Sequence, residues 1–111
     1  MYAITFDFDT DTLKNAYHND SWNNAYADVR KVLIGEFNFQ WQQGSVYFGG
    51  DSVDAVTCVM AVQELADRFD WFEASVRDIR MLRIDEDNDL GPAIGRASSK
   101  KKGRAQLSKA A

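Results

Sequence analysis

Acidic, hydroxyl and guanidinium side chains recur at three separate points of the chain, and together they suit chemistry on a phosphodiester. Asp7 ends an alternating segment, where a carboxylate could hold Mg²⁺ or activate an attacking water. Ser45 follows a glycine and could bond a phosphate oxygen or orient the attacking hydroxyl. Arg77 and Arg80 could each form bidentate hydrogen bonds to phosphate oxygens and stabilise charge in the transition state.

Each of these residues also has an explanation that involves no chemistry. Asp7 could bond a backbone N–H or pair with Arg77, and Ser45 could simply shape a tight turn. Arg77, Arg80 and Arg83 could pair with nearby acids on a solvated strand, and for Arg83 we prefer this explanation. The acids within reach along the sequence are Asp78, Asp85 and Glu86.

The sequence offers few other catalytic signatures. His18 is the only histidine, so one chain cannot supply a pair of catalytic histidines. Cys58 is the only cysteine, which excludes an internal disulfide and a Cys/His metal cluster. We expect it to be a buried thiol in a reducing compartment, and hence a cytoplasmic protein. Gly49-Gly50-Asp51 lacks the length and the lysine of a phosphate-binding loop. Catalysis would then depend on a metal, or on positioning and arginine.

Length and composition indicate one globular domain. The chain has 111 residues, of which 45% are hydrophobic, enough for an independent core. It contains no run of about 18 apolar residues, so we expect no membrane span. A secretory signal is not expected either, because the first residues already form an alternating strand.

Charge divides the chain into an acidic body and a basic tail. All 17 acids lie within residues 1–90, whereas six of the 13 basic residues lie within residues 91–111. The tail also carries the only proline and shows no apolar periodicity, so we expect it to be disordered. A basic appendage on an acidic body is typical of a polyanion partner, for which Lys100, Lys101 and Lys102 are the candidate residues, or of contact with the acids of the body itself. A solvated tail without a partner is the alternative.

The positioning elements follow from periodicity. Residues 1–9 alternate as a strand, and a helical turn or two follows around Leu13 to Tyr17. Gly35 is expected to end the first long helix, and Asp51 or Ser52 to cap the second. The expected elements after the first strand are a helix over residues 23–34, strands over 37–42 and 45–48, a second helix, and a strand over 75–84.

The order βαββαβ predicts an α+β, ferredoxin-like fold with a four-stranded antiparallel sheet and both helices on one face. The expected strand order is 4-1-3-2, which brings Asp7, Ser45 and residues 77–80 to one rim of the sheet. The second helix is expected to bury Val56, Val59, Met60 and Leu65. Alternating apolar residues are expected to meet the helices: Tyr2, Ile4, Phe6, Phe8, Phe37, Phe39, Trp41, Val46 and Phe48.

The other face of the sheet is expected to be polar and uncovered, with Tyr47 placed to stack on a base. The last strand is apolar on both faces, because Ile79 and Met81 alternate with Arg80 and Leu82. This pattern indicates a contact on the open face as well, most simply a homodimer.

Four segments resemble the VapD family (virulence-associated protein D) in order and spacing over residues 1–90. They are Met1-Tyr2-Ala3-Ile4-Thr5-Phe6-Asp7, Asn24-Ala25-Tyr26-Ala27-Asp28-Val29-Arg30, Gln43-Gly44-Ser45-Val46-Tyr47, and Trp71-Phe72 with Ser75-Val76-Arg77-Asp78-Ile79-Arg80. The resemblance implies a small cytoplasmic dimeric ribonuclease of toxin–antitoxin type, with an antitoxin partner. The implied fold is similar to that of CRISPR-associated adaptation proteins with a ferredoxin-like domain. By motif, the implied site residues are Asp7 and Ser45; the basic tail is not part of the family pattern.

Two functions are therefore expected from the sequence. The first is an endoribonuclease that cleaves mRNA at the arginine rim, with Mg²⁺ as an open question. The second is a non-catalytic dimeric scaffold that binds nucleic acid or protein. The excess of acids in residues 1–90 argues against strong general affinity for RNA, because phosphate contacts dominate such binding.

Overall fold

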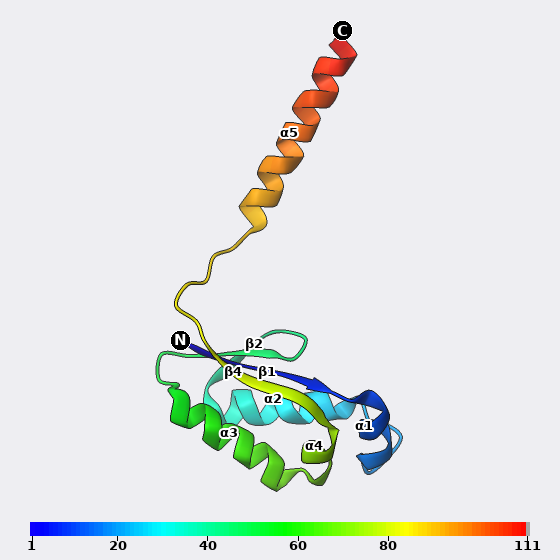
Figure 1. The fold of residues 1–111 in the computed structure, drawn as a ribbon, viewed down its shortest axis with the longest axis vertical. Helices are drawn as coiled ribbons and strands as arrows, with labels where there is room; N and C mark the ends of the chain where they lie inside the picture. The colour runs from blue at the N-terminus through cyan, green and yellow to red at the C-terminus, as the bar shows by residue number, and fades with distance from the viewer. Residues whose placement is uncertain (111) are drawn as a thin grey trace.

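The computed structural model describes residues 1–110, and their side chains through residue 105; Lys109 of the basic tail lies outside the described side chains. The element order confirms the predicted βαββαβ arrangement, with two short helices, α1 and α4, added to it (Figure 1). The elements are β1 (Tyr2–Phe8), α1 (Thr10–Ala16), α2 (Asn24–Phe37), β2 (Phe39–Gln43), β3 (Val46–Gly49), α3 (Ala55–Arg68), α4 (Asp70–Ser75), β4 (Val76–Arg83) and α5 (Gly91–Ala110).

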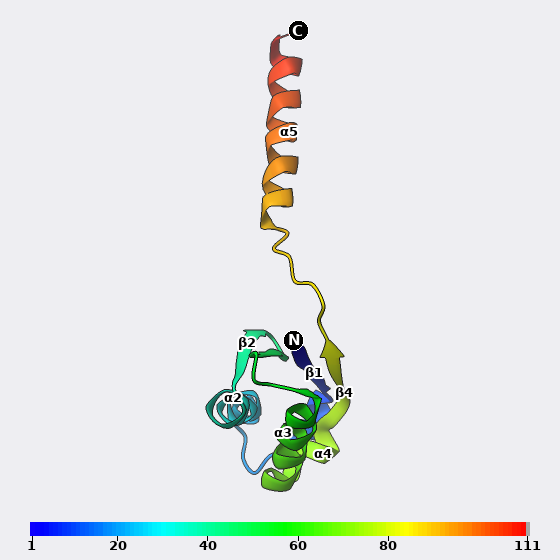
Figure 2. The same ribbon diagram turned by 90° about the vertical axis from the view of Figure 1, so that its left-hand side faces the viewer.

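Two layers make up the body. The sheet has four strands in the order β2-β3-β1-β4, all antiparallel to their neighbours, as the sequence predicts. Figure 2 shows α2 and α3 together on one side of the sheet, which leaves the other side uncovered. This arrangement puts β1 at the centre, between β3 and β4, and makes β4 an edge strand.

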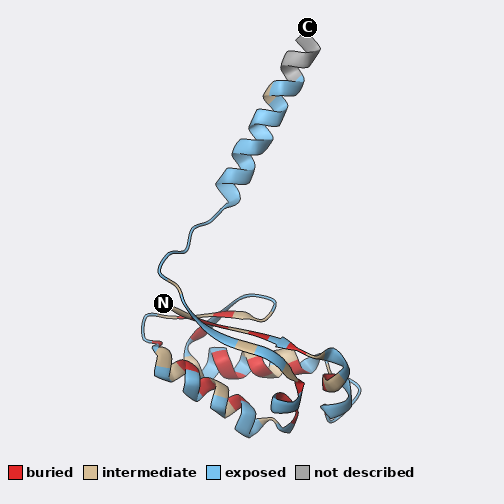
Figure 3. Cartoon of the chain, in the orientation of Figure 1, coloured by how far each residue is buried: buried red, intermediate tan, exposed pale blue. Residues whose placement is uncertain are grey.

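The core lies between the sheet and the helices (Figure 3). In β1 the alternation places Ile4, Phe6 and Phe8 inward, and all three are buried. Phe8 meets the rings of Trp71 and Phe72 from α4 edge-on, at centroid distances of 6.0 and 5.8 Å. The carboxyl end of β1 is therefore held by α4, and the segment that begins β4 follows α4 directly.

The face assignment of β3 predicted from the sequence is wrong by one residue. Tyr47, expected on the open face, is 1% exposed and stacks against Phe6 in the core, with ring centroids 6.2 Å apart. Val46 and Phe48 lie on the open face instead. The cause is the turn between β2 and β3: the register shifts between Trp41 and Gln43, and a shift of one residue reverses every side chain that follows.

The two long helices also depart from the sequence prediction. Helix α2 runs through Gly35 to Phe37 and ends at Asn38, which takes the left-handed conformation at φ 62°. Helix α3 is capped by Asp54, whose carboxylate accepts from the backbone N–H of Thr57 at 2.8 Å. It buries Cys58, Ala61 and Leu65, so only Leu65 of the predicted stripe is correct. The other three, Val56, Val59 and Met60, are more than half exposed.

The basic tail forms helix α5, where the sequence pattern predicts disorder (Figures 1 and 2). Pro92 suits the first turn of a helix, and the alanines, lysines and arginines that follow are good helix formers. The domain boundary at residue 90 stays a prediction. Within residues 1–110, no helix combines the length and the apolar character needed to cross a membrane.

Candidate active site at the rim of the open sheet face

Asp7 lies at the end of β1, on the uncovered face of the sheet. Its neighbours Phe6 and Phe8 are buried on the opposite face, which turns the Asp7 side chain outward. The strand ends at Phe8, and the next residue, Asp9, caps α1: its carboxylate accepts from the backbone N–H of Thr12 at 3.1 Å. This hydrogen bond holds the pKa of Asp9 below its ordinary value. Asp9 is therefore committed to the fold, whereas the exposed Asp7 carboxylate makes an ion pair with the exposed Arg77.

A β-bulge brings Arg77 to Asp7. The register between β1 and β4 pairs Asp7 with Asp78 and Phe8 with Val76, so Arg77 is the extra residue. The backbone N–H of Asp9 also bonds the carbonyl oxygen of Ser75 at 2.8 Å, which fixes the strand ends. A bulge redirects side chains locally. Here Arg77 Nε lies 3.2 Å from Asp7 Oδ2, although strict alternation would turn Arg77 and Asp78 to opposite faces.

Asp78 and Arg80 extend the same surface along β4. Asp78 is directly opposite Asp7, and Arg80 is opposite Thr5, in the ladder with β1. Arg80 Nε lies 3.1 Å from the Asp78 carboxylate. Two carboxylates thus face each other, and each has its own guanidinium partner: Arg77 pairs with Asp7, and Arg80 pairs with Asp78. Arg77 and Arg80 thus make the ion pairs that the sequence offers as the alternative to phosphate binding. For Arg83 the preferred explanation, pairing with an acid, is confirmed, because its Nε lies 3.3 Å from Asp85.

Ser45 reaches the rim from the other side of β1. It lies in the turn between β2 and β3, after Gly44, whose φ of 48° suits glycine in a tight turn. The carbonyl oxygen of Ser45 accepts from the backbone N–H of Phe6 at 3.1 Å, next to Asp7 in the chain. The structure therefore brings the serine turn, Asp7 and the arginine segment to one edge of the sheet. The ladder sets Ser45 opposite the inward-facing Phe6, so Ser45 lies beside the open face that carries Asp7 and not on it.

Solvent exposure leaves these ion pairs open to exchange. The side chains of Asp7 and Arg77 are 63% and 62% exposed, and those of Asp78 and Arg80 are 49% and 69% exposed. Exposed pairs of this kind contribute at most about 1 kcal/mol. An incoming phosphate can therefore take over the arginines at little energetic cost, because charge-assisted bonds to phosphate have similar geometry.

Two residues near Asp7 were not identified as functional from the sequence. The sequence pattern marks Asp78 only as a partner for arginine, whereas the ladder between β1 and β4 places it opposite Asp7. Tyr26, at the start of α2, packs against Phe8 with centroids 5.3 Å apart. Burial, and secondarily the negative charge of Asp7, raise the pKa of Tyr26. Its hydroxyl therefore stays protonated at neutral pH and is a hydrogen-bond donor close to the rim.

The carboxylates at the rim could bind Mg²⁺ only as part of its coordination shell, with substrate phosphate and water as the other ligands. Asp7 and Asp78 supply carboxylate oxygens, the hard ligands that Mg²⁺ prefers. The described residues contain no group of three or more His, Cys, Asp or Glu side chains that could hold a metal ion by themselves. Mg²⁺ is commonly bound through one or two carboxylates together with substrate phosphates and water, and this rim suits that mode.

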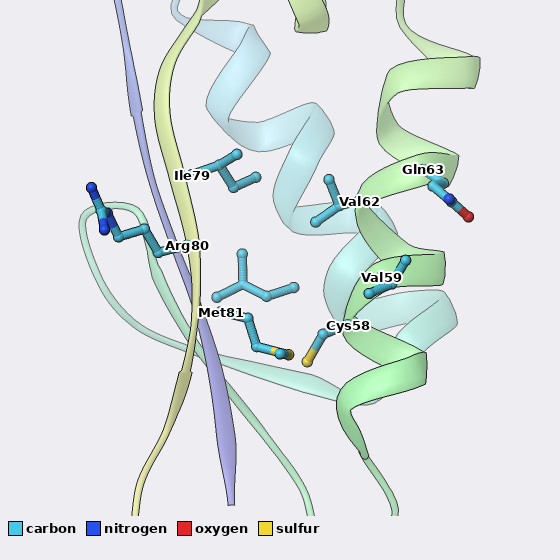
Figure 4. Close-up of a pocket in the computed structure, with 8 residues that line it drawn as sticks. Cys58, Val59, Val62, Gln63, Ile79, Arg80 and Met81 are labelled. Carbon is cyan, nitrogen blue, oxygen red and sulfur yellow. The ribbon is translucent and has the colours of Figure 1, made fainter.

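The apolar hollow beside α3 is separate from this rim. It has a volume of about 210 Å³ and lies between α3 and β4, on the helix side of the sheet. Figure 4 shows Cys58, Val62, Ile79 and Met81 around it, whereas the Arg80 side chain extends to the other side of β4. Burial is the main cause that raises the pKa of the Cys58 thiol, as expected for an unreactive buried cysteine.

Some predicted binding residues lie away from the rim. Tyr47 is in the core and cannot stack on a base, so that prediction is wrong. Lys100, Lys101 and Lys102 lie on α5, apart from the body (Figure 1). His18 stacks on Tyr17 in the loop after α1, with ring centroids 4.2 Å apart.

Comparison with known proteins gives the chain its relatives. No protein-family model matches it. It is 52% identical over 94 residues to endoribonuclease VapD 2 of Riemerella anatipestifer, covering 85% of this chain and 99% of the relative. It is 51% identical to an endoribonuclease VapD homolog of Helicobacter pylori, with 85% and 96% covered. Endoribonuclease VapD of Dichelobacter nodosus is 39% identical, with 81% and 92% covered. Identity at this level over nearly the full length of each relative shows that the chain belongs to the VapD family.

Proposed function

We propose that the chain is an endoribonuclease that cleaves mRNA at the rim formed by Asp7, Ser45, Arg77 and Arg80. The observation that carries this proposal is the bulge in β4, which turns Arg77 onto the face that holds Asp7. Relatives at 52% and 51% identity are named endoribonucleases, which supports the same activity here.

The roles follow from the charges at the rim. Arg77 and Arg80 leave their carboxylate partners and bind the non-bridging oxygens of the scissile phosphate, where negative charge grows in the transition state. Asp7, released from Arg77, accepts the proton of the attacking water or hydroxyl as the new P–O bond forms. The P–O bond to the leaving ribose oxygen breaks, and that oxygen takes up a proton from Asp7 or from water. Ser45 bonds a phosphate oxygen or orients the attacking group. Mg²⁺, when bound at Asp7, supplies additional stabilisation of phosphate charge. A rim that depends on positioning, without a histidine pair, is consistent with slow turnover.

The cleavage experiment compares variants of the rim with matched variants outside it. Purified wild-type protein, Asp7→Asn, Ser45→Ala and Arg77→Gln are incubated with labelled RNA, in Mg²⁺ and in EDTA. Asp85→Asn and Arg83→Gln are the controls, because they break an exposed Asp–Arg pair of similar geometry at the opposite end of β4. We expect Asp7→Asn and Arg77→Gln to lose at least tenfold in rate, and the controls to keep it.

Two outcomes decide between the candidate functions. If wild type and all variants cut equally, the cleavage comes from a contaminant and the non-catalytic scaffold is the better explanation. If EDTA abolishes wild-type cleavage, the activity requires a divalent cation, and Asp7 with Asp78 are its candidate ligands.

We also propose that the protein is a homodimer packed through the open face of the sheet. Phe48 and Leu82 flank Ala3 on that face, in the ladders that β1 makes with β3 and β4. Phe48, Ala3 and Leu82 thus form an apolar row across three strands, and Leu82, at its end, is 45% exposed. Exposed apolar rows of this kind are typical of protein interfaces. Such a dimer places two rims, each with an Asp7, on one shared surface.

The biological role that we propose is that of a cytoplasmic toxin restrained by an antitoxin. The proposal depends on the family resemblance, and the buried free thiol of Cys58 agrees with a reducing compartment. Induced expression of wild type in a bacterial host should slow growth and shorten transcripts, whereas Asp7→Asn should do neither. Equal growth arrest by both proteins would contradict a toxin that acts through this rim.

A further inference from the structure

Helix α5 is the most basic surface of the molecule, and it contacts little of the body. It follows residues 84–90 and projects away from the sheet in both views (Figures 1 and 2). Its side chains through residue 105 are exposed apart from the position of Gly103, as Figure 3 shows. Ile94, its large apolar residue in this range, is 73% exposed.

The stabilising side-chain contact of α5 in the described residues is at its start, where the Asp89 carboxylate accepts from the backbone N–H of Gly91 at 2.8 Å. Helices in folded proteins gain most of their stability from packing against other elements, and α5 lacks such packing here. Residues 91–111 contain no acid, so no ion pair within the helix can offset its positive charges. Arg96, Lys100 and Arg104 are spaced at i, i+4 and i+8, where like charges repel and destabilise a helix.

The same spacing makes a linear cationic surface. At 1.5 Å per residue, Arg96, Lys100 and Arg104 form a ridge with a positive charge about every 6 Å. Lys101 lies about 100° around the helix from Lys100, and Lys102 lies on nearly the opposite face. A straight row of cations without intervening acids matches the backbone of a nucleic acid better than a compact ligand.

We propose that α5 is an RNA-binding arm, whose helix is stabilised when phosphates neutralise the ridge of Arg96, Lys100 and Arg104. The choice of RNA as the polyanion rests on the proposed function. The acidic body is the alternative partner, but α5 projects away from it, although the body carries every acid of the chain (Figure 1). The relative from Riemerella anatipestifer is covered to 99%, yet 15% of this chain has no counterpart in it. In this proposal the arm adds affinity for RNA, and the rim of the sheet performs the chemistry.

The binding test uses the full chain with the Asp7→Asn substitution, which keeps the RNA intact during measurement. Affinity for a labelled single-stranded RNA of about 20 nucleotides is measured by anisotropy between 50 and 300 mM salt, roughly the range in which phosphate contacts are screened. The ridge variant carries Arg96→Gln, Lys100→Gln and Arg104→Gln. The matched control carries Lys14→Gln, Lys31→Gln and Arg83→Gln, which remove the same charge from the body.

We expect the ridge variant to lose at least tenfold in affinity at low salt, and its log–log salt slope to fall by about 2. The control should change either quantity much less. Equal losses in both proteins would overturn the proposal, because the effect would then be that of total charge alone. An unchanged ridge variant would overturn it as well.

A second pair of substitutions tests whether the helix is the binding form. Gly95 and Gly103 lie within α5 and have open space around them, so Gly95→Ala and Gly103→Ala favour the helix without a clash. We expect their combination to raise RNA affinity several-fold and to increase helical circular dichroism. Weaker binding would contradict a helical arm.

The proposed RNA-binding arm and the proposed catalytic rim can be disproved independently. If the protein binds RNA through the ridge but cuts none, the proposed catalytic function is wrong and the arm remains. If the ridge variant of the catalytic protein cuts and binds RNA as well as wild type does, the arm is wrong and the rim remains.

Discussion

Asp7 and Asp78 face each other directly across β1 and β4, on the uncovered side of the sheet. Like charges at such positions destabilise a pair of strands. Each carboxylate is held instead by its own arginine, Arg77 for Asp7 and Arg80 for Asp78. A structural role alone gives no reason to keep two acids opposed, whereas a surface that binds a cation does.

The first prediction concerns this opposition. Asp78→Asn removes one of the two facing charges and weakens one exposed ion pair, so the free energy of unfolding should change by less than about 1 kcal/mol. Urea unfolding monitored by tryptophan fluorescence measures this change. Asp85→Asn is the control, because Asp85 pairs with Arg83 at 3.3 Å at the far end of β4. A larger loss for Asp78→Asn than for the control would show that the pair with Arg80 outweighs the repulsion.

The second prediction follows from the burial of Tyr47. Tyr47→Phe keeps the ring against Phe6 and should leave RNA affinity and cleavage unchanged. Tyr47→Ala empties a core position that is 1% exposed and should cost about 3–5 kcal/mol of stability. Thermal unfolding and RNA binding of both variants provide the measurement. A large loss of RNA affinity in a stable Tyr47→Phe variant would restore the stacking role.

How far the sequence predicts this molecule depends on what sets each feature. Periodicity and chain connectivity determine the sheet order and the rim, so both were predicted. The faces of β3 depend on the register shift between Trp41 and Gln43, which leaves no clear mark in the composition. In the same way, the bulge at Arg77 is visible only from the pairing of β4 with β1.

Helix α3 shows a second limit of pattern reading. It turns small residues, Cys58 and Ala61, towards the sheet and leaves Val59 and Met60 outside. Hydrophobicity alone favours the opposite face, because it ranks the larger side chains as the core. Close approach of helix and sheet selects the smaller ones, and this selection is a tertiary effect.

The third prediction locates the dimer interface. Leu82 and Met81 are adjacent in β4 and equally exposed, at 45% and 46%, but Leu82 lies on the open face and Met81 beside the apolar hollow. Leu82→Glu should convert a dimer into a monomer, because it places a charge in a buried contact. Met81→Glu should leave the dimer intact. Sedimentation at micromolar concentration measures both.

The opposite result has a clear meaning. If Met81→Glu dissociates the dimer and Leu82→Glu does not, the dimer interface lies at the apolar hollow between α3 and β4. A wild-type protein that is monomeric under the same conditions would contradict a dimer through either surface.

The fourth prediction concerns alkaline stability and Tyr17. The buried Tyr17 hydroxyl donates to Asp28 Oδ2 at 2.7 Å. Burial, and secondarily this bond and the charge of Asp28, raise the pKa of Tyr17 to about 12 from its ordinary value of 10.0. Tyr17→Phe removes the donor from the half-buried Asp28, and at neutral pH it should cost about 1–3 kcal/mol.

The difference between wild type and Tyr17→Phe should depend on pH with a definite sign. The folded state holds the phenol proton more tightly than the unfolded state does, so the wild-type advantage is complete below about pH 10. Between about pH 10 and 12 the unfolded state loses the proton first, and the advantage falls as pH rises. Urea unfolding of both proteins from pH 8 upward, about one unit apart, measures the difference, in which the other titrating groups largely cancel. A difference that stays constant through pH 11 would show that the bond to Asp28 does not hold the Tyr17 proton.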